Sequence, residues 1–99
     1  MDDPDAMGAV GKVWVHWVCW NILPTGAFSA SLCAEGMTDF GEVGYGGPAP
    51  PDKRHTYVFK LYALDCKLDL PMESTKADVE KAMEGHIIEQ TQLTGTYAP

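Results

Sequence analysis

The 99-residue sequence predicts one mostly β domain with a single amphipathic helix near its C-terminus. Two segments, residues 12–22 and 57–64, are rich in the β-branched and aromatic residues typical of strands. A third segment, after residue 75, repeats its apolar residues at helical spacing. Because a chain of this length supports one hydrophobic core, we expect residues 1–99 to form a single domain.

The segment from Lys12 to Ile22 is predicted to be a central strand. It is apolar at both odd and even positions, as a strand covered on both faces should be. His16 shares its parity with Trp14 and Trp20, so it falls on an aromatic face where an unpaired charge is costly. We therefore expect His16 to be neutral or to have a carboxylate neighbour.

The stretch from Ala27 to Pro51 is rich in glycine and has no sustained period. It predicts either a long ordered loop or short strands joined by turns. Its last part, from Gly44 to Pro51, cannot be helical because its three prolines lack N–H donors and restrict the residues before them. This part should form a stiff wall.

Tyr57 to Leu64 alternates between two faces and predicts a second strand, and His55 shares the parity of Tyr57. Thr75, followed three residues later by Asp78, resembles a capping box, so a helix should begin there. The apolar face of this helix is expected to pack on the sheet and to consist of Val79, Ala82, Met83, His86, Ile87 and Gln90. Residues 92–97 predict a short closing strand.

Charge and hydropathy exclude several classes of function. Fourteen acidic and seven basic residues give a net charge of −7, which opposes binding of nucleic acid. The longest strongly apolar run, from Val13 to Ile22, is about half the roughly 20 residues of a membrane-spanning helix. We therefore expect no nucleic-acid partner and no transmembrane segment.

Cysteine usage and the N-terminus indicate the cellular compartment. The 3 cysteines cannot all pair within the chain, and none has C-x-x-C spacing, so we expect reduced structural thiols. The N-terminal residues have neither a basic nor an apolar signal-peptide region. The sequence thus predicts a cytoplasmic location, unless a missing N-terminal segment contains a signal peptide.

Candidate chemistry is concentrated in two aspartates and two histidines. Asp3 and Asp5 flank a proline, and on an extended chain their side chains would lie on one side. Taken separately, the Asp-Pro-Asp turn, a buried His16 and a loop His55 each have an ordinary structural explanation. The chain has no complete P-loop, no serine-nucleophile motif and no metal-binding spacing, so we expect no cofactor, no metal and no catalytic nucleophile.

Six segments in a fixed order resemble the phosphatidylethanolamine-binding protein family, in its bacterial and archaeal Raf-kinase-inhibitor-like branch. The resemblance spans nearly the whole chain. The segments are Asp3–Ala6, Trp14–Trp17 with Asn21–Ile22, Gly44–Pro51, His55–Tyr57, Leu61–Asp65 and Leu93–Tyr97.

This resemblance implies an antiparallel β-sandwich-like fold built around a large sheet, with a small pocket at one end of the sheet. The pocket would accept a phosphate-like anion or the phosphoethanolamine head group of a phospholipid. The residues that match the lining of the family's pocket are Asp3, Asp5, His16, Ala49, Pro50, Pro51, His55 and Tyr57. The aspartates would hold the imidazoles in the required protonation state, and backbone donors would meet the anion.

The sequence departs from the family pattern in three ways. Met7 stands where the family usually has proline, and Thr56 replaces an arginine that would pair with an aspartate. The family also has a substantial N-terminal segment with sheet strands, so these 99 residues are expected to be an N-terminally truncated form of the fold: either Met1 is an internal codon of a longer gene, or the chain is a natural truncation. A sheet shortened in this way would expose an edge and favour homodimerisation or aggregation.

The resemblance favours a non-enzymatic binding module, able to regulate a kinase or protease as relatives do. One alternative is a hydrolase or lyase that uses His16 as general base with Asp3 or Asp5 orienting it. Another is a truncated paralogue without a working pocket.

Overall fold

The chain folds mainly as strands, which form two antiparallel sheets in the computed structural model. The structure describes residues 1–22 and 33–99. Its elements are β1 (Asp2–Asp3), η1 (Pro4–Ala6), α1 (Met7–Val10), β2 (Trp14–Val15), β3 (Cys19–Trp20), β4 (Ala34–Glu35), β5 (His55–Leu64), α2 (Lys76–Met83) and β6 (Ile87–Tyr97). The predicted fold class is confirmed.

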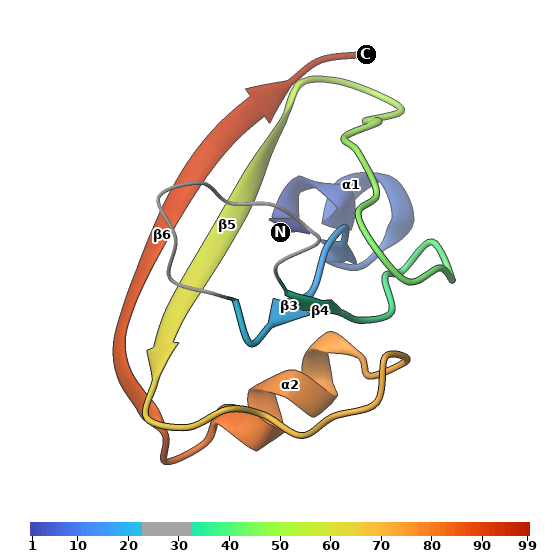
Figure 1. Ribbon diagram of the computed structural model, residues 1–99. Helices are drawn as coiled ribbons and strands as arrows, with labels where there is room; N and C mark the ends of the chain where they lie inside the picture. The colour runs from blue at the N-terminus through green and yellow to red at the C-terminus, as the bar shows by residue number, and fades with distance from the viewer. Residues whose placement is uncertain (23–32) are drawn as a thin grey trace.

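The larger sheet has the strand order β2-β1-β5-β6. Its long strands, β5 and β6, pair antiparallel from His55 opposite Tyr97 to Leu64 opposite Ile87. Figure 1 shows this pair as a long curved ribbon. The predicted second strand is therefore correct, and the closing strand begins five residues earlier than predicted, at Ile87.

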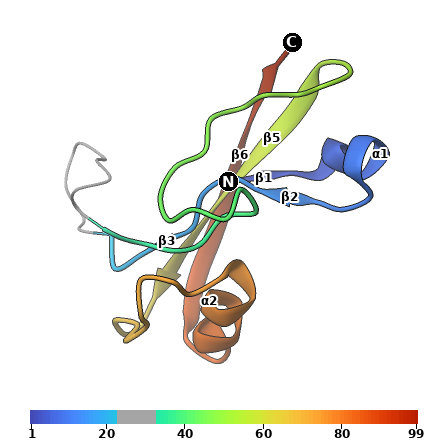
Figure 2. The same ribbon diagram turned by 90° about the vertical axis from the view of Figure 1, so that its right-hand side faces the viewer.

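The segment from Lys12 to Ile22 is not one central strand, contrary to the prediction. It contributes β2 to the edge of the larger sheet and β3 to a separate two-stranded sheet with β4. The chain leaves the first sheet after Val15, where the amide of His16 donates to the carbonyl of Met1. Figure 2 shows the segment passing from β2 to β3 away from the long strands.

The segment is also not covered on both faces, contrary to the prediction. His16, Val18 and Trp20 are buried, whereas Val15 and Trp17 are only half-buried. Burial alternates along the segment, so one face points inward and the other is only partly covered.

The glycine-rich stretch consists of short pieces of strand joined by turns. It contains β4, an isolated bridge between Met37 and Val43, and no helix or strand from residue 44 to residue 51. This agrees with the second of the two alternatives predicted for the stretch and with a proline wall at its end. The part of the predicted loop between residues 27 and 32 lies outside the described residues.

Helix α2 begins where the sequence predicts, because Thr75 and Asp78 form a capping box. It ends at Met83, so the expected helical face is too long. Gly85 adopts a left-handed conformation with φ of 78°, and His86 then precedes β6. His86, Ile87 and Gln90 therefore do not belong to the helix, and Ile87 and Gln90 are strand residues.

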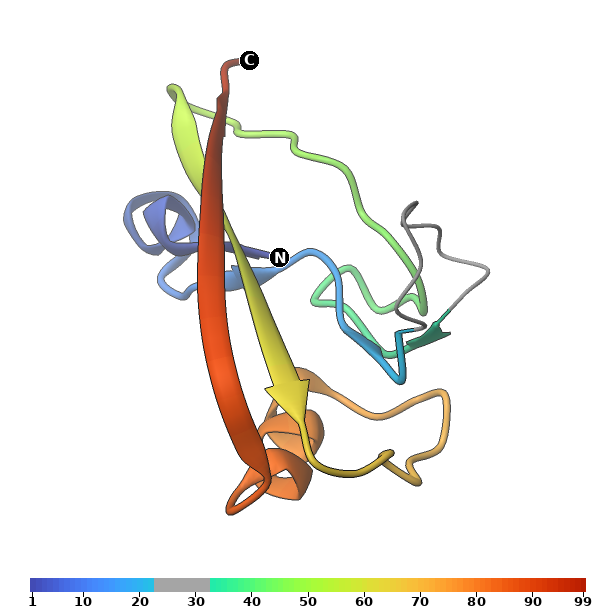
Figure 3. The same cartoon turned by 60° about the vertical axis from the view of Figure 1, so that its left-hand side comes forward.

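The hydrophobic core lies between α2, the smaller sheet and the C-terminal end of β5. Val18, Trp20, Leu68, Val79 and Met83 are its buried members. Asn21 secures the loop that supplies Leu68, because its side chain donates to the Leu68 carbonyl at 2.7 Å and accepts from the Leu68 amide at 2.8 Å. Figure 3 shows α2 and the smaller sheet on the same side of the long strands.

Two short helices near the N-terminus were not predicted. Pro4 begins η1, which continues into α1, and the Asp3 carboxylate caps η1 by accepting from the amide of Asp5 at 3.0 Å. The Asp-Pro-Asp motif is thus a helical turn rather than an extended segment, because proline favours the first helical position and aspartate the cap. No helix in the described ranges is long and apolar enough to cross a membrane.

Candidate functional site

Asp3 and His55 meet where β1 lies beside the beginning of β5. His55 is fully buried, and its Nδ1 lies 2.6 Å from Oδ2 of Asp3. Its Nε2 lies 2.7 Å from Oδ1 of Asp52. Because ionised carboxylates can only accept, both ring nitrogens must donate and His55 must be an imidazolium.

The charges around His55 support this protonation state. The hydrogen bond with Asp3 is the main cause that raises the pKa of His55, while burial opposes it and Asp52 adds to it. Burial acts to raise the pKa of Asp52, but hydrogen bonds from His55 and the Lys53 amide outweigh it and lower that pKa. His55 therefore fastens Asp3 and Asp52 together and has no free nitrogen for a ligand.

Asp5 links the N-terminal turn to β5. Its carboxylate accepts from the backbone amide of Thr56 at 2.7 Å. Its own amide donates to Oδ1 of Asp3, so both carboxylate oxygens of Asp3 have partners. Asp3 and Asp5 do share one locale, as the sequence predicts, although a helical turn rather than an extended chain brings them together.

His16 is buried between two aromatic rings and is joined to the glycine-rich loop. Its ring lies 5.1 Å from the rings of both Phe40 and Tyr57, edge to face in each case. Its Nδ1 lies 2.8 Å from the carbonyl oxygen of Gly46, and the Gly46 amide donates to the His16 carbonyl at 2.8 Å. Since a carbonyl can only accept, Nδ1 has the proton, and Nε2 has no partner among the described residues.

The structure does not give His16 the carboxylate neighbour that was one of the two alternatives expected for it. A backbone carbonyl occupies the place of the expected carboxylate, and Asp3 pairs with His55 instead. A side chain on Gly46 would collide with the ring of Phe40, so the loop approaches His16 this closely only with glycine there.

The Tyr57 hydroxyl is buried next to His16 without a hydrogen-bond partner in residues 1–22 and 33–99. Burial raises the pKa of Tyr57, the charge of Asp3 adds to this, and the nearby Ala49 amide acts in the opposite direction. An unsatisfied buried polar group costs about 1–3 kcal/mol, so the position calls for a water or a small ligand.

One residue of the predicted wall, Ala49, lies next to Tyr57. Pro50 is buried, while Ala49 and Pro51 are exposed. The structure thus brings together Asp3, Asp5 and His55 in one cluster, and His16 and Tyr57 in an adjoining one. That these residues bind a ligand stays a prediction.

Three residues of this region were missed by sequence reasoning. Asp52 is the second partner of His55, Gly46 the partner of His16, and Phe40 the ring packed against His16. The spacing of Asp52 three residues before His55 was the one available signal. The contacts of Gly46 and Phe40 depend on how the loop folds back.

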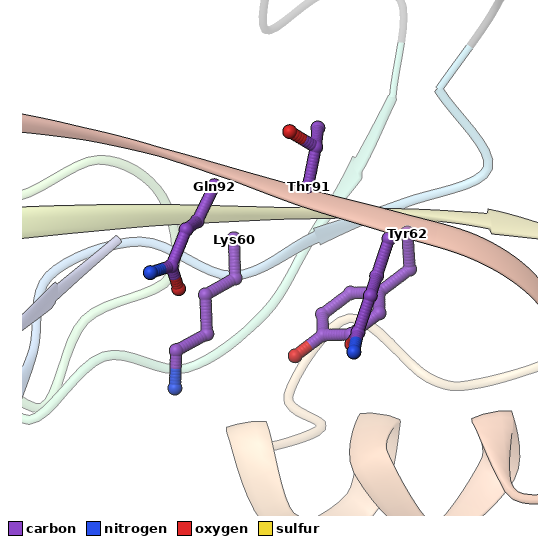
Figure 4. A pocket seen from close by; sticks show the side chains of 5 residues that line it. Lys60, Tyr62, Thr91 and Gln92 are labelled. Carbon is purple, nitrogen blue, oxygen red and sulfur yellow. The ribbon is translucent and has the colours of Figure 1, made fainter.

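Two cavities lie outside the predicted pocket. One, of about 340 Å³, is formed by the loop residues Thr38, Phe40, Glu42, Val43, Gly44, Tyr45, Gly46 and Gly47. The other, of about 500 Å³, is lined by Lys60, Tyr62, Gln90, Thr91 and Gln92 of β5 and β6. In Figure 4, Lys60, Tyr62 and Gln92 extend toward the side on which α2 lies, and Thr91 extends away from it.

Comparisons with known proteins identify relatives along the whole chain. The family model described as "Phosphatidylethanolamine-binding protein" matches residues 1–98. A UPF0098 protein of Methanothermobacter thermautotrophicus is 42% identical over 106 residues, covering 97% of this chain and 68% of the relative. A UPF0098 protein of Pyrococcus horikoshii is 40% identical over 111 residues, covering 98% of this chain and 54% of the relative.

Solved structures give the same result. A phosphatidylethanolamine-binding protein homologue from Chlamydia trachomatis matches with a TM-score of 0.86 and 38% identity, over 97% of this chain and 67% of that one. YbcL of Escherichia coli matches with a TM-score of 0.78 and 32% identity, over 97% of this chain and 66% of that one. The chain thus spans between about half and about two thirds of the length of these relatives. With a family model matched from residue 1 to residue 98 and solved relatives of the same fold, the chain belongs to the phosphatidylethanolamine-binding protein family.

Proposed function

We propose that this chain is a binding module whose pocket, formed by His16, Tyr57 and the Ala49–Pro51 wall, accepts a phosphate-like anion such as the phosphoethanolamine head group. The observation that supports it most is the buried Tyr57 hydroxyl without a partner, beside a histidine whose Nε2 is also unpaired within the described chain. A phosphate oxygen could satisfy both groups at once, since both donate when His16 is protonated.

The arrangement of charge suits this assignment. The net charge of −7 gives the chain no general attraction for anions, so binding must depend on local donors. The His55 imidazolium partly neutralises Asp3 and Asp52, which would otherwise repel an anion at the pocket. His55 is fully enclosed, so in this proposal it positions Asp3, and His16 is the histidine that meets the ligand.

A hydrolase or lyase is less well supported. That mechanism needs a carboxylate to orient His16, whereas Nδ1 of His16 is bonded to a backbone carbonyl and Asp3 to His55. The binding module needs no such pair, because its contacts are hydrogen bonds to a ligand.

The proposal is tested by titrating inorganic phosphate and phosphoethanolamine by NMR and calorimetry. His16→Ala should abolish most of the affinity, because it removes the ring whose Nε2 the ligand would meet. Tyr57→Phe should weaken binding several-fold, because it removes the hydroxyl that has no partner among the described residues.

Tyr97→Phe is the matched control, because Tyr97 is exposed at the end of β6 and its substitution should leave affinity unchanged. An affinity that is unchanged in His16→Ala would show that the ligand binds elsewhere. Turnover of phosphoester or ester substrates that disappears in His16→Ala would establish the enzymatic alternative instead.

A further inference from the structure

We propose that Asp65, Cys66 and His86 form a site for a zinc-class divalent cation. Each residue offers one ligand atom, and these atoms all lie within 4.8 Å of one another. The three side chains are exposed, so a cation can reach them from solvent. The site lies at the opposite end of β5 from His55 and shares no residue with the proposed anion pocket.

The backbone holds the two contributing segments together. Asp65 and Cys66 directly follow β5, and His86 directly precedes β6. The amide of Asp65 donates to the carbonyl of His86 at 3.0 Å. The amide of His86 donates to the carbonyl of Met83, also at 3.0 Å. The left-handed Gly85 turns the chain out of α2 at this point. The backbone hydrogen bonds and the turn at Gly85 therefore fix the backbone positions of the three ligand residues.

The donor atoms indicate the class of cation. A thiol, an imidazole and a carboxylate together suit a borderline ion such as Zn²⁺, whereas Mg²⁺ and Ca²⁺ prefer all-oxygen sites. Nδ1 of His86 and Oδ1 of Asp65 lie 2.8 Å apart and share a hydrogen bond, so both atoms already face one point. A bound cation would replace this hydrogen bond, and the proton on Nδ1 would pass to solvent or be replaced by one on Nε2. Three protein ligands leave the fourth tetrahedral position for water.

The thiol must lose its proton when a cation binds. A cysteine binds a metal as the thiolate rather than as the thiol. On binding, the sulfur–metal bond forms and this proton passes to solvent. The bound cation would tie the end of β5 to the start of β6 and so enclose the segment that includes α2.

The test uses Co²⁺ as a spectroscopic probe and Zn²⁺ as a competitor, on the whole chain kept reduced with a phosphine. The wild type should bind one Co²⁺, with a sulfur-to-cobalt charge-transfer band and the strong visible bands of tetrahedral cobalt, and Zn²⁺ should abolish both. Cys66→Ser should remove the charge-transfer band. His86→Ala and Asp65→Asn should each weaken Zn²⁺ binding by about tenfold or more in calorimetry.

Cys33→Ser and Asp69→Asn are the matched controls, because each removes the same kind of ligand outside the site. Both should retain the wild-type spectrum and affinity. Circular dichroism should show that every variant is folded. The proposal is overturned if the wild type binds neither ion, if the band persists in Cys66→Ser, or if it is lost in Cys33→Ser. None of these readouts involves phosphate, so they are independent of the anion pocket.

Discussion

His16 is buried, and its Nε2 is the ring nitrogen without a hydrogen-bond partner among the described residues. Its exposed fraction is 3%, and its Nδ1 is committed to the Gly46 carbonyl. The aromatic rings of Phe40 and Tyr57 hold the imidazole plane edge to face. A histidine held in this way keeps one tautomer and presents Nε2 in a defined direction, which a ligand-binding residue requires and a solvent-exposed histidine lacks.

Thr56 is the position where a single substitution should strengthen the N-terminal cluster. The carboxylate of Asp5 accepts from the Thr56 amide, and Arg54 donates to Thr96 rather than to Asp5. Thr56→Arg would supply the cation that the family pattern has there. Because Asp5 is half-buried, we expect the free energy of unfolding to rise by up to about 1 kcal/mol, measured by urea denaturation.

A double-mutant cycle distinguishes a charge pair from a general effect of the larger side chain. Thr56→Gln should give no gain, and Thr56→Arg should lose its gain in an Asp5→Asn background. A gain that persists without the Asp5 carboxylate would show that the arginine acts through other contacts.

At the scale of elements, α2 depends on its cap as well as on packing. The helix has eight residues, which is too short to be stable by propensity alone. The Thr75 hydroxyl accepts from the Asp78 amide at 3.3 Å, and the Asp78 carboxylate accepts from the Thr75 amide at 3.0 Å. Val79 and Met83 then fasten one face of the helix in the core.

Thr75→Ala should therefore destabilise the protein by about 1 kcal/mol, because it leaves the Asp78 amide without its capping partner. Thermal denaturation followed by circular dichroism measures this loss. Thr75→Ser, which keeps the hydroxyl, should restore most of it. Equal melting temperatures for the alanine and serine variants would mean that packing alone holds the helix.

The whole molecule is held together at two ionic junctions that join segments distant in sequence. His55 connects the end of β1, the loop containing Asp52 and the start of β5. Asp2 connects β1 to α2, because its carboxylate lies 2.8 Å from Nζ of Lys76 and 3.8 Å from Nζ of Lys60. Asp2 and Asp3 are consecutive residues of β1, so their side chains point to opposite faces of the strand. The two junctions add side-chain contacts to a strand that is only two residues long.

The His55 junction should make global stability depend on pH. The folded-state pKa of His55 is raised above its ordinary value of 6.5. The junction therefore makes its full contribution to the free energy of unfolding below about pH 6.5. Its contribution is lost as pH rises through the raised value. The lowered pKa of Asp52 acts on the acid side, where stability falls only as that carboxylate becomes protonated. Melting temperature should therefore decline as pH rises from about 6.5 into the alkaline range.

Asp52→Asn isolates this effect, because it removes one of the two carboxylates that favour the imidazolium. The alkaline decline should begin at lower pH in this variant. Asp69→Asn, a change of equal charge at an exposed position, should leave the profile as in the wild type. A wild-type melting temperature that stays constant across this range would contradict the assigned protonation state of His55.

The sequence by itself determined the features that depend on local chemistry. Residue type and alternation predicted β5. The threonine and aspartate at residues 75 and 78 predicted the start of α2. Ordered motifs predicted the family. The order of the motifs extends along the chain, whereas the other signals are each contained in a short window, because capping and strand alternation are interactions between near neighbours in the chain.

Only the tertiary structure decided which partners those residues have. It divided the predicted first strand between two sheets, ended α2 at Met83, and gave His16 a carbonyl and His55 two carboxylates. It also placed Asp65, Cys66 and His86 together. Hydrogen bonds such as Asp3 to His55 join residues 52 positions apart, and no local pattern contains their geometry. Which donor meets which acceptor is set by how the sheets and loops pack, so these contacts follow only from the folded chain.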